Sequence, residues 1–170
     1  MDMQKIRISE TTPNAPEWAD AVGRFFLNFA LIELVTTEFI KRMAAEFKYK
    51  SMKKKFLSQK LTWIIDNLSD STDADKATIR ETIAVLEEIR ELSFFRNVLA
   101  HAALGFEFPG QGGDGKPALA GVLNFKPDDE DEESELIPLE EIRERSAESA
   151  ALAGKILDLL NGMELSKVTE

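Results

Sequence analysis

Residues 85–101 read VLEEIRELSFFRNVLAH, and no other stretch of the 170-residue chain has a clearer helical periodicity. Its apolar side chains recur at spacings of three and four, which is typical of one buried helix face. The stripe consists of Val85, Ile89, Leu92, Arg96, Leu99 and Ala103. A cation, Arg96, therefore occupies the middle of the face that is expected to meet the core. Because an unpaired buried charge is very unfavourable, we expect Arg96 to be paired or to line a polar cleft.

Other helices are predicted on both sides of this one. A first helix covers 18–43, and over 25–35 it is apolar nearly all round, which is typical of a helix buried on more than one side. In a small domain, the extra side is expected to be covered by another subunit. A second helix is predicted to begin near Ser51, and the third helix to begin after an N-cap at Asp73.

The fold predicted from these patterns is one mainly α domain, a bundle of about four main helices. A small β-hairpin or extended insertion is expected between the third and the last helix, because short apolar runs flank a segment rich in glycine and proline. The expected parts are an N-terminal arm at 1–14, three helices within 15–105, the β and acidic-loop insertion at 106–137, the last helix at 138–162 and a tail at 163–170.

Composition excludes several classes of function. The chain is 44% hydrophobic and 31% charged, so it has the material for a core and is not disordered as a whole. It has no cysteine and one histidine, which excludes thiol chemistry and a site with several histidine ligands in one chain. We predict no cofactor and no metal. No apolar run reaches the roughly 18 residues of a membrane span and no secretory leader is apparent, so a cytoplasmic protein without a membrane partner is expected.

The net charge of −10 is unevenly distributed. Residues 41–60 contain eight basic side chains and one acidic one, whereas seven of the eight residues at 128–135 are acidic. One interpretation is that both segments serve solubility. The other is an RNA-binding patch, because three of the lysines are predicted to open a helix, where the dipole disfavours cations and a phosphate would favour them. The candidate RNA-binding residues are Lys48, Lys50, Lys53, Lys54 and Lys55.

The end of the third predicted helix brings together three groups that suit phosphate chemistry. Asn97 and His101 are four residues apart and share a helix face, at about 100° and 140° from Arg96. A histidine can exchange a proton near pH 7, and an arginine can hold a phosphate through two hydrogen bonds. A purely structural interpretation stays open, with the arginine as an ion-pair anchor and the histidine as an ordinary edge residue.

The string RNVLAH at 96–101 resembles the arginine, four to six residues, histidine motif of the HEPN superfamily. The resemblance extends over roughly 15–162 and implies a compact helical bundle. Many such proteins are metal-independent endoribonucleases that act as homodimers with one composite cleft. For this chain, the resemblance implies that His101 is the general acid or base in the attack of a ribose 2′-hydroxyl. It also implies that Arg96 stabilises the transition state and that Asn97 positions the phosphate.

The same resemblance leaves alternatives open. Some toxin members carry a tyrosine two residues after the histidine, where a partner enzyme modifies them; this chain has Ala103 there, which argues against that subgroup. Other members are catalytically silent. The leading hypothesis is therefore a HEPN-like ribonuclease of a toxin or defence system, with an antitoxin or other protein partner. The alternative is a non-catalytic dimerisation module that binds a protein or a nucleotide.

Glu33 is a second polar residue within an apolar stripe, with Phe26 and Ile40 seven residues on either side. We expect it to pair with Arg96, in the protomer or across a dimer. If both side chains are deeply buried, removing one should cost about 3–5 kcal/mol. The alternative is a carboxylate at the rim of a dimer.

Overall fold

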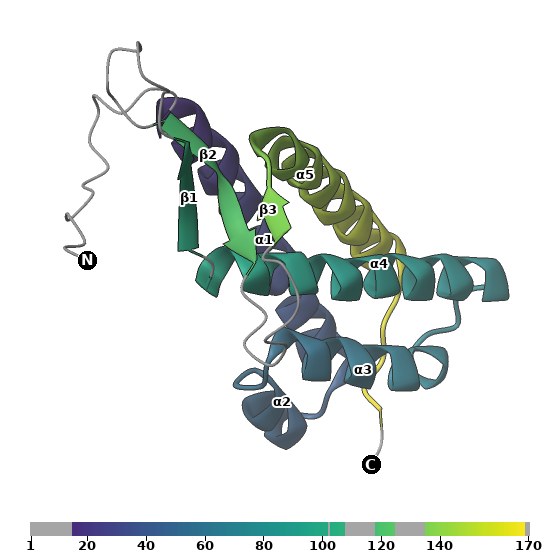
Figure 1. Cartoon of the computed structure of the whole chain (residues 1–170). Helices are drawn as coiled ribbons and strands as arrows, with labels where there is room; N and C mark the ends of the chain where they lie inside the picture. Colours follow the sequence, from purple (N-terminus) through teal and green to yellow (C-terminus); the bar gives the residue numbers. More distant parts are fainter. Residues whose placement is uncertain (1–14, 102, 108–117, 125–134, 169–170) are drawn as a thin grey trace, which may run out of the picture.

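The computed structural model describes residues 15–101, 103–107, 118–124 and 135–168 (Figure 1). The elements are α1 (Ala15–Met43), α2 (Glu46–Met52), α3 (Leu57–Asn67), a short 3₁₀ turn η1 (Leu68–Asp70), α4 (Lys76–His101), β1 (Ala103–Glu107), β2 (Ala118–Asn124), β3 (Glu135–Ile137) and α5 (Leu139–Gly162). The mainly helical bundle predicted from the sequence is confirmed. The predicted arm at 1–14 and most of the predicted acidic loop lie outside the described residues.

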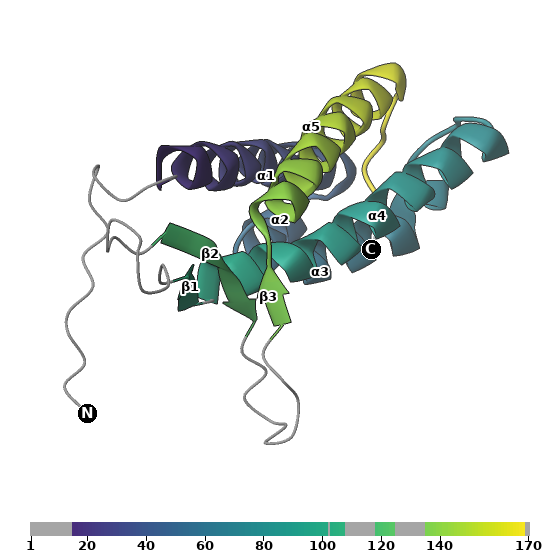
Figure 2. The ribbon, with the colours of Figure 1, turned by 45° about the horizontal axis from the view of Figure 1, so that its top comes forward.

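The bundle is organised around α1, which packs along α5 and contacts α3, while α4 crosses α1 and α5 (Figures 1 and 2). The inward face of α1 carries apolar residues at spacings of three and four, as an amphipathic helix requires. The largest fully buried side chains come from four helices; they include Phe25, Phe39, Ile40, Ile64, Leu86, Ile89 and Ile142. The main core cluster therefore fixes the relative positions of α1, α3, α4 and α5, and Ile142 belongs to a second, smaller cluster with Trp18, Ala21 and Ile137.

The apolar segment at 25–35 is divided between two sides of α1. Phe25, Phe29, Ile32 and Val35 are buried within the protomer. Leucines on the other side are exposed. The chain's own α3, α4 and α5 cover the phenylalanine side, and the expectation that another subunit covers the extra, leucine side stays a prediction.

The predicted second helix is two helices. Ser51 lies near the end of α2 rather than at a helix start, and α3 begins at Leu57 after Phe56, whose extended backbone (φ −62°, ψ 154°) ends the turn. The lysines at 53–55 therefore follow the C-terminus of α2, where the helix dipole favours cations. The expectation that all three open a helix is wrong, because Lys53 is the C-cap of α2 and Lys55 lies two residues before the first residue of α3.

The N-cap of α4 is Asp75 and not Asp73. Asp75 Oδ1 accepts hydrogen bonds from the backbone N–H groups of Ala77 (2.7 Å) and Thr78 (3.0 Å), and Oδ2 accepts one from the Thr78 hydroxyl (3.1 Å). These bonds, those from the Thr78 and Ala77 backbone above all, hold the pKa of the Asp75 carboxyl below its ordinary 3.8. Asp73 lies two residues too early to reach the N–H groups of the first turn, which begins at Lys76.

Three short antiparallel strands lie between α4 and α5, in the order β1-β2-β3. The β1–β2 register shifts between Gly105 and Phe106, and β3 runs through Pro138 directly into α5. The sheet thus lies beside the end of α4 that carries His101 (Figure 1). It connects the candidate motif to the last helix.

Candidate functional site

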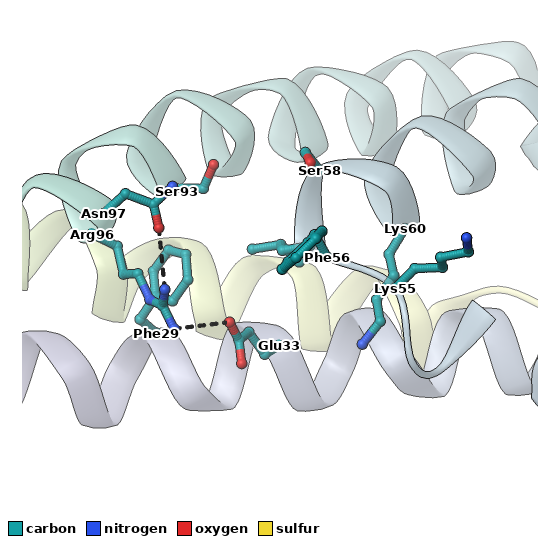
Figure 3. Close-up of a pocket in the computed structure, with 10 residues that line it drawn as sticks. Phe29, Glu33, Lys55, Phe56, Ser58, Lys60, Ser93, Arg96 and Asn97 are labelled. Atoms are coloured by element: carbon teal, nitrogen blue, oxygen red, sulfur yellow. Dashed lines mark hydrogen bonds and ion pairs between the residues drawn. The ribbon is translucent and has the colours of Figure 1, made fainter. Parts of the chain in front are cut away.

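A cleft of about 390 Å³ lies where α1, α4 and the start of α3 meet (Figure 3). Its lining residues are Phe29 and Glu33 from α1, Lys55, Phe56, Leu57, Ser58 and Lys60 around the start of α3, and Ser93, Arg96 and Asn97 from α4. Two of the three motif residues thus share a cleft with part of the predicted basic cluster. The lining carries three cations and one carboxylate, so the cleft has a net positive charge.

Arg96 is held at the cleft by three contacts. Its Nη2 lies 3.8 Å from Glu33 Oε1, and its Nη1 donates a hydrogen bond to Asn97 Oδ1 at 3.1 Å. The guanidinium carbon lies 5.9 Å from the centroid of the Phe29 ring, within the range of a cation–π contact. The predicted Glu33–Arg96 pair is confirmed. These contacts hold the guanidinium in place before any ligand arrives.

The pair is exposed to solvent, contrary to the expectation that Arg96 faces the core. The side chains of Arg96 and Glu33 keep 37% and 44% of their accessible surface. The reason is that the buried face of α4 rotates along the helix: Val85 and Ile89 are buried in the main core, whereas near the C-terminus Phe95 and Leu99 pack inward. Arg96 lies about 60° around α4 from Leu99 and about 100° from Phe95, so it ends at the edge of this C-terminal buried face.

The predicted lysine cluster does not act as one unit. Lys55 lines the cleft, whereas Lys48, Lys50, Lys53 and Lys54 are not among its lining residues. The Lys50 ammonium pairs with Glu46 at 2.6 Å, and the Lys53 ammonium lies 5.8 Å from the centroid of the Tyr49 ring.

Lys60 was missed as a site residue. Its ammonium donates a hydrogen bond to Thr37 Oγ1 at 3.2 Å and lines the cleft opposite Arg96. A lysine in the middle of a helix that is predicted to begin near Ser51 gives no sign in the sequence of the cleft that it faces. Only the packing of α3 against α1 places it there.

The start of α3 contributes groups that sequence reasoning also missed. Phe56 is 81% exposed, and in Figure 3 its ring stands between Arg96 and the lysine side of the cleft. No side chain caps the α3 N-terminus, where Gln59 and Lys60 donate their N–H groups to Phe56 O. An uncapped helix start next to cations favours anions. In the sequence, the only sign of this part of the cleft is an aromatic residue, Phe56, directly after three lysines.

His101 lies outside this cleft. It is the last residue of α4, is exposed, and follows Asn97 by one helical turn on the same face. Of the three motif residues, the structure therefore brings Arg96 and Asn97 to the cleft and leaves His101 about one turn beyond its edge.

In the described ranges, no group of three or more histidine or acidic side chains is placed to hold a metal ion. No described helix is both long enough and apolar enough to cross a bilayer.

Comparison with known proteins found no match: no family model, no curated protein and no solved structure is similar to this chain. Any assignment of function therefore depends on the cleft itself and on the motif at 96–101.

The exposure of the Glu33–Arg96 pair predicts a small effect on stability. Glu33→Gln should change the free energy of unfolding by less than about 1 kcal/mol, because a solvent-screened pair contributes little. Urea denaturation will measure it, with Asp20→Asn as the matched control, since Asp20 forms an exposed pair with Arg24 on the same helix. A loss of 3 kcal/mol or more for Glu33→Gln alone would mean that the pair is buried in solution.

Proposed function

We propose that the cleft binds the phosphate backbone of single-stranded RNA. The observation that carries this proposal is the convergence of Arg96 from α4 with Lys55 and Lys60 from the predicted basic segment. A guanidinium can hold a phosphate through two parallel hydrogen bonds, and the ammonium groups add point charges beside it. The exposed Phe56 ring offers a surface on which a base can stack, which is how single strands are commonly held.

The reaction we propose is metal-independent cleavage of that RNA, as the resemblance to HEPN ribonucleases implies. A strand held at Arg96 and leaving past Asn97 would next meet the His101 imidazole, one turn further along α4. His101 would take the proton of a ribose 2′-hydroxyl as its oxygen attacks the adjacent phosphorus. The 5′-oxygen would leave with a proton from solvent, and Arg96 would stabilise the charge that develops on the phosphoryl oxygens.

Binding without cleavage is the second candidate function. The observation that favours it is the position of His101 outside the cleft lining. On this alternative, the chain is a HEPN-like module that binds a nucleotide or a protein partner. Both candidates share the same anion-binding cleft, so a test of the cleft precedes a test of cleavage.

The cellular setting belongs to the proposal as well. A metal-independent ribonuclease of this kind would act in the cytoplasm, as a toxin or defence protein held in check by a protein partner. We also propose that it works as a homodimer.

The cleft predicts which lysines contact RNA. Lys55→Ala/Lys60→Ala should weaken binding of a fluorescein-labelled single-stranded RNA by about tenfold near 0.1 M salt, and lower the log–log salt slope by about 0.7 for each lost phosphate contact. Fluorescence anisotropy across a salt series measures both. The single variant Lys55→Ala is compared with Lys54→Ala as its matched control, because each removes one positive charge from the same exposed turn but Lys54 does not line the cleft.

The outcome of this comparison decides whether binding is local. Equal losses for Lys54→Ala and Lys55→Ala would mean that RNA responds only to the overall charge of the segment. No measurable RNA binding by the wild-type protein would reject the proposed function altogether.

A further inference from the structure

The outward side of α1 carries an exposed apolar stripe. Leu27, Leu31 and Leu34 follow one another at spacings of four and three, so they share one helix face, opposite the buried phenylalanines. They are 74%, 40% and 66% exposed, although leucine is among the residue types most often buried. These exposed fractions show that, within the described residues, no other element covers the stripe. A row of large apolar side chains of this kind marks an interaction surface.

Charged pairs bound the stripe at both ends. Asp20 and Arg24 lie towards the N-terminus and form an ion pair of 2.9 Å. Glu38 and Lys41 lie towards the C-terminus and form one of 3.1 Å. The order of charges along the outer face is therefore minus, plus, three leucines, minus, plus.

This order is complementary to itself when two copies of α1 run antiparallel. If the two-fold axis between the copies passes between residues 30 and 31 of α1, Leu27 faces Leu34 of the second copy, and Asp20 faces Lys41. Arg24 then lies within one residue, about 1.5 Å along the axis, of Glu38. Four opposite-charge pairs thus close both ends of a leucine contact.

A parallel pairing has the opposite effect. Each charged residue would face its own counterpart, with acid against acid and base against base. Like charges at an interface are unfavourable, whereas complementary ones select partner and register.

We propose that this outer face of α1 is an interface with a second copy of the chain, paired antiparallel about a two-fold axis between residues 30 and 31. Such an interface is isologous, because the same patch serves both copies. Glu33 lies at least about 100° around α1 from each of the three leucines, so the cleft stays open in each protomer. This dimer keeps two separate clefts, unlike the single composite cleft that the family resemblance implies, and it does not depend on RNA binding.

Engineered cysteines test the register, since the chain has no cysteine of its own. Leu31→Cys should form an interchain disulfide under mild oxidation, because two copies of position 31 lie within about 1.5 Å along the axis. Leu27→Cys and Leu34→Cys should cross-link in an equimolar mixture and not separately. Alone, each is about 10 Å from its symmetry mate along the axis, beyond disulfide reach.

Non-reducing gels give the readout, and Ala84→Cys, an exposed position on α4, measures random collision. Cross-linking of the mixture above the Ala84→Cys level, with neither single variant doing so, supports the antiparallel pairing. Efficient cross-linking of Leu27→Cys alone, or no cross-linking above the control by any variant, overturns it.

Sedimentation tests the same interface without oxidation. Arg24→Glu and Glu38→Arg should each weaken dimerisation several-fold, because each places like charges opposite one another, and the double variant should restore it. Leu31→Glu should give monomers with unchanged helical content by circular dichroism and unchanged RNA affinity per protomer. A monomeric wild-type protein at micromolar concentration, or a double variant no stronger than the single ones, would contradict the proposal.

Discussion

His101→Ala is expected to reduce RNA cleavage by a factor of about 10²–10⁴ while leaving RNA affinity within about twofold of the wild type. The reason is spatial. His101 lies beyond the proposed RNA-binding cleft, so His101→Ala would remove the proposed proton-transfer group and no lining residue. The assay is cleavage of a defined single-stranded RNA in EDTA, with affinity measured in parallel by anisotropy.

Two controls separate binding from chemistry. Phe94→Ala changes another exposed side chain on the same face of α4 and should leave both quantities unaltered. Arg96→Ala should lower both, because the guanidinium serves the bound phosphate and the transition state. Undiminished cleavage by purified His101→Ala would remove the histidine from the mechanism. A wild-type protein that binds RNA without cutting it would leave the binding module as the function.

The Glu33–Arg96 contact illustrates what the sequence is able to predict. Each residue interrupts an apolar stripe on its own helix, and opposite charges at such positions tend to meet. That reasoning needs only periodicity, and it correctly paired two residues from α1 and α4. It overestimated their burial, because the buried face of α4 changes from the main core to the cluster around Trp18, Ile137 and Ile142.

The rest of the cleft depends on packing that periodicity does not report. Lys60 and Ser58 belong to it only because α3 starts where it does, and the predicted second helix began near Ser51, without the break before Leu57. The basic segment at 41–60 is predicted from the sequence to form one surface, but the break before Leu57 divides it. Lys55 turns into the cleft, and its neighbours take other partners or face solvent.

The first helix shows the same limit in another form. The segment at 25–35 correctly indicates apolar side chains on two sides of α1, but the sequence does not say which side meets the protomer's own core. In the structure the aromatic side is internal and the leucine side is outward. Between α1 and α4, the rings of Phe25 and Phe95 pack edge to face.

Phe25→Ala is expected to lower the free energy of unfolding by about 3–5 kcal/mol, a large part of the stability of a domain this size. Phe25 is fully buried, and its ring contacts those of Phe29 (5.9 Å between centroids) and Phe95 (5.4 Å). Removing it opens a cavity between α1 and α4 that a rigid core refills only in part. Urea denaturation followed by circular dichroism gives the value.

Phe25→Ala should also affect the cleft, although Phe25 lies in the core. The Phe29 ring stacks on the Phe25 ring and also contacts the Arg96 guanidinium. Loss of Phe25 would therefore loosen the packing of the Phe29 ring, which helps to position Arg96. RNA affinity of the folded fraction should fall several-fold, although Phe25 is not among the residues lining the cleft. Phe47→Ala is the control, since that ring is 86% exposed and should change stability by no more than about 0.5 kcal/mol. A Phe25→Ala protein that is destabilised and yet binds RNA at full affinity would show that Arg96 is positioned by Glu33 and Asn97 without help from the core.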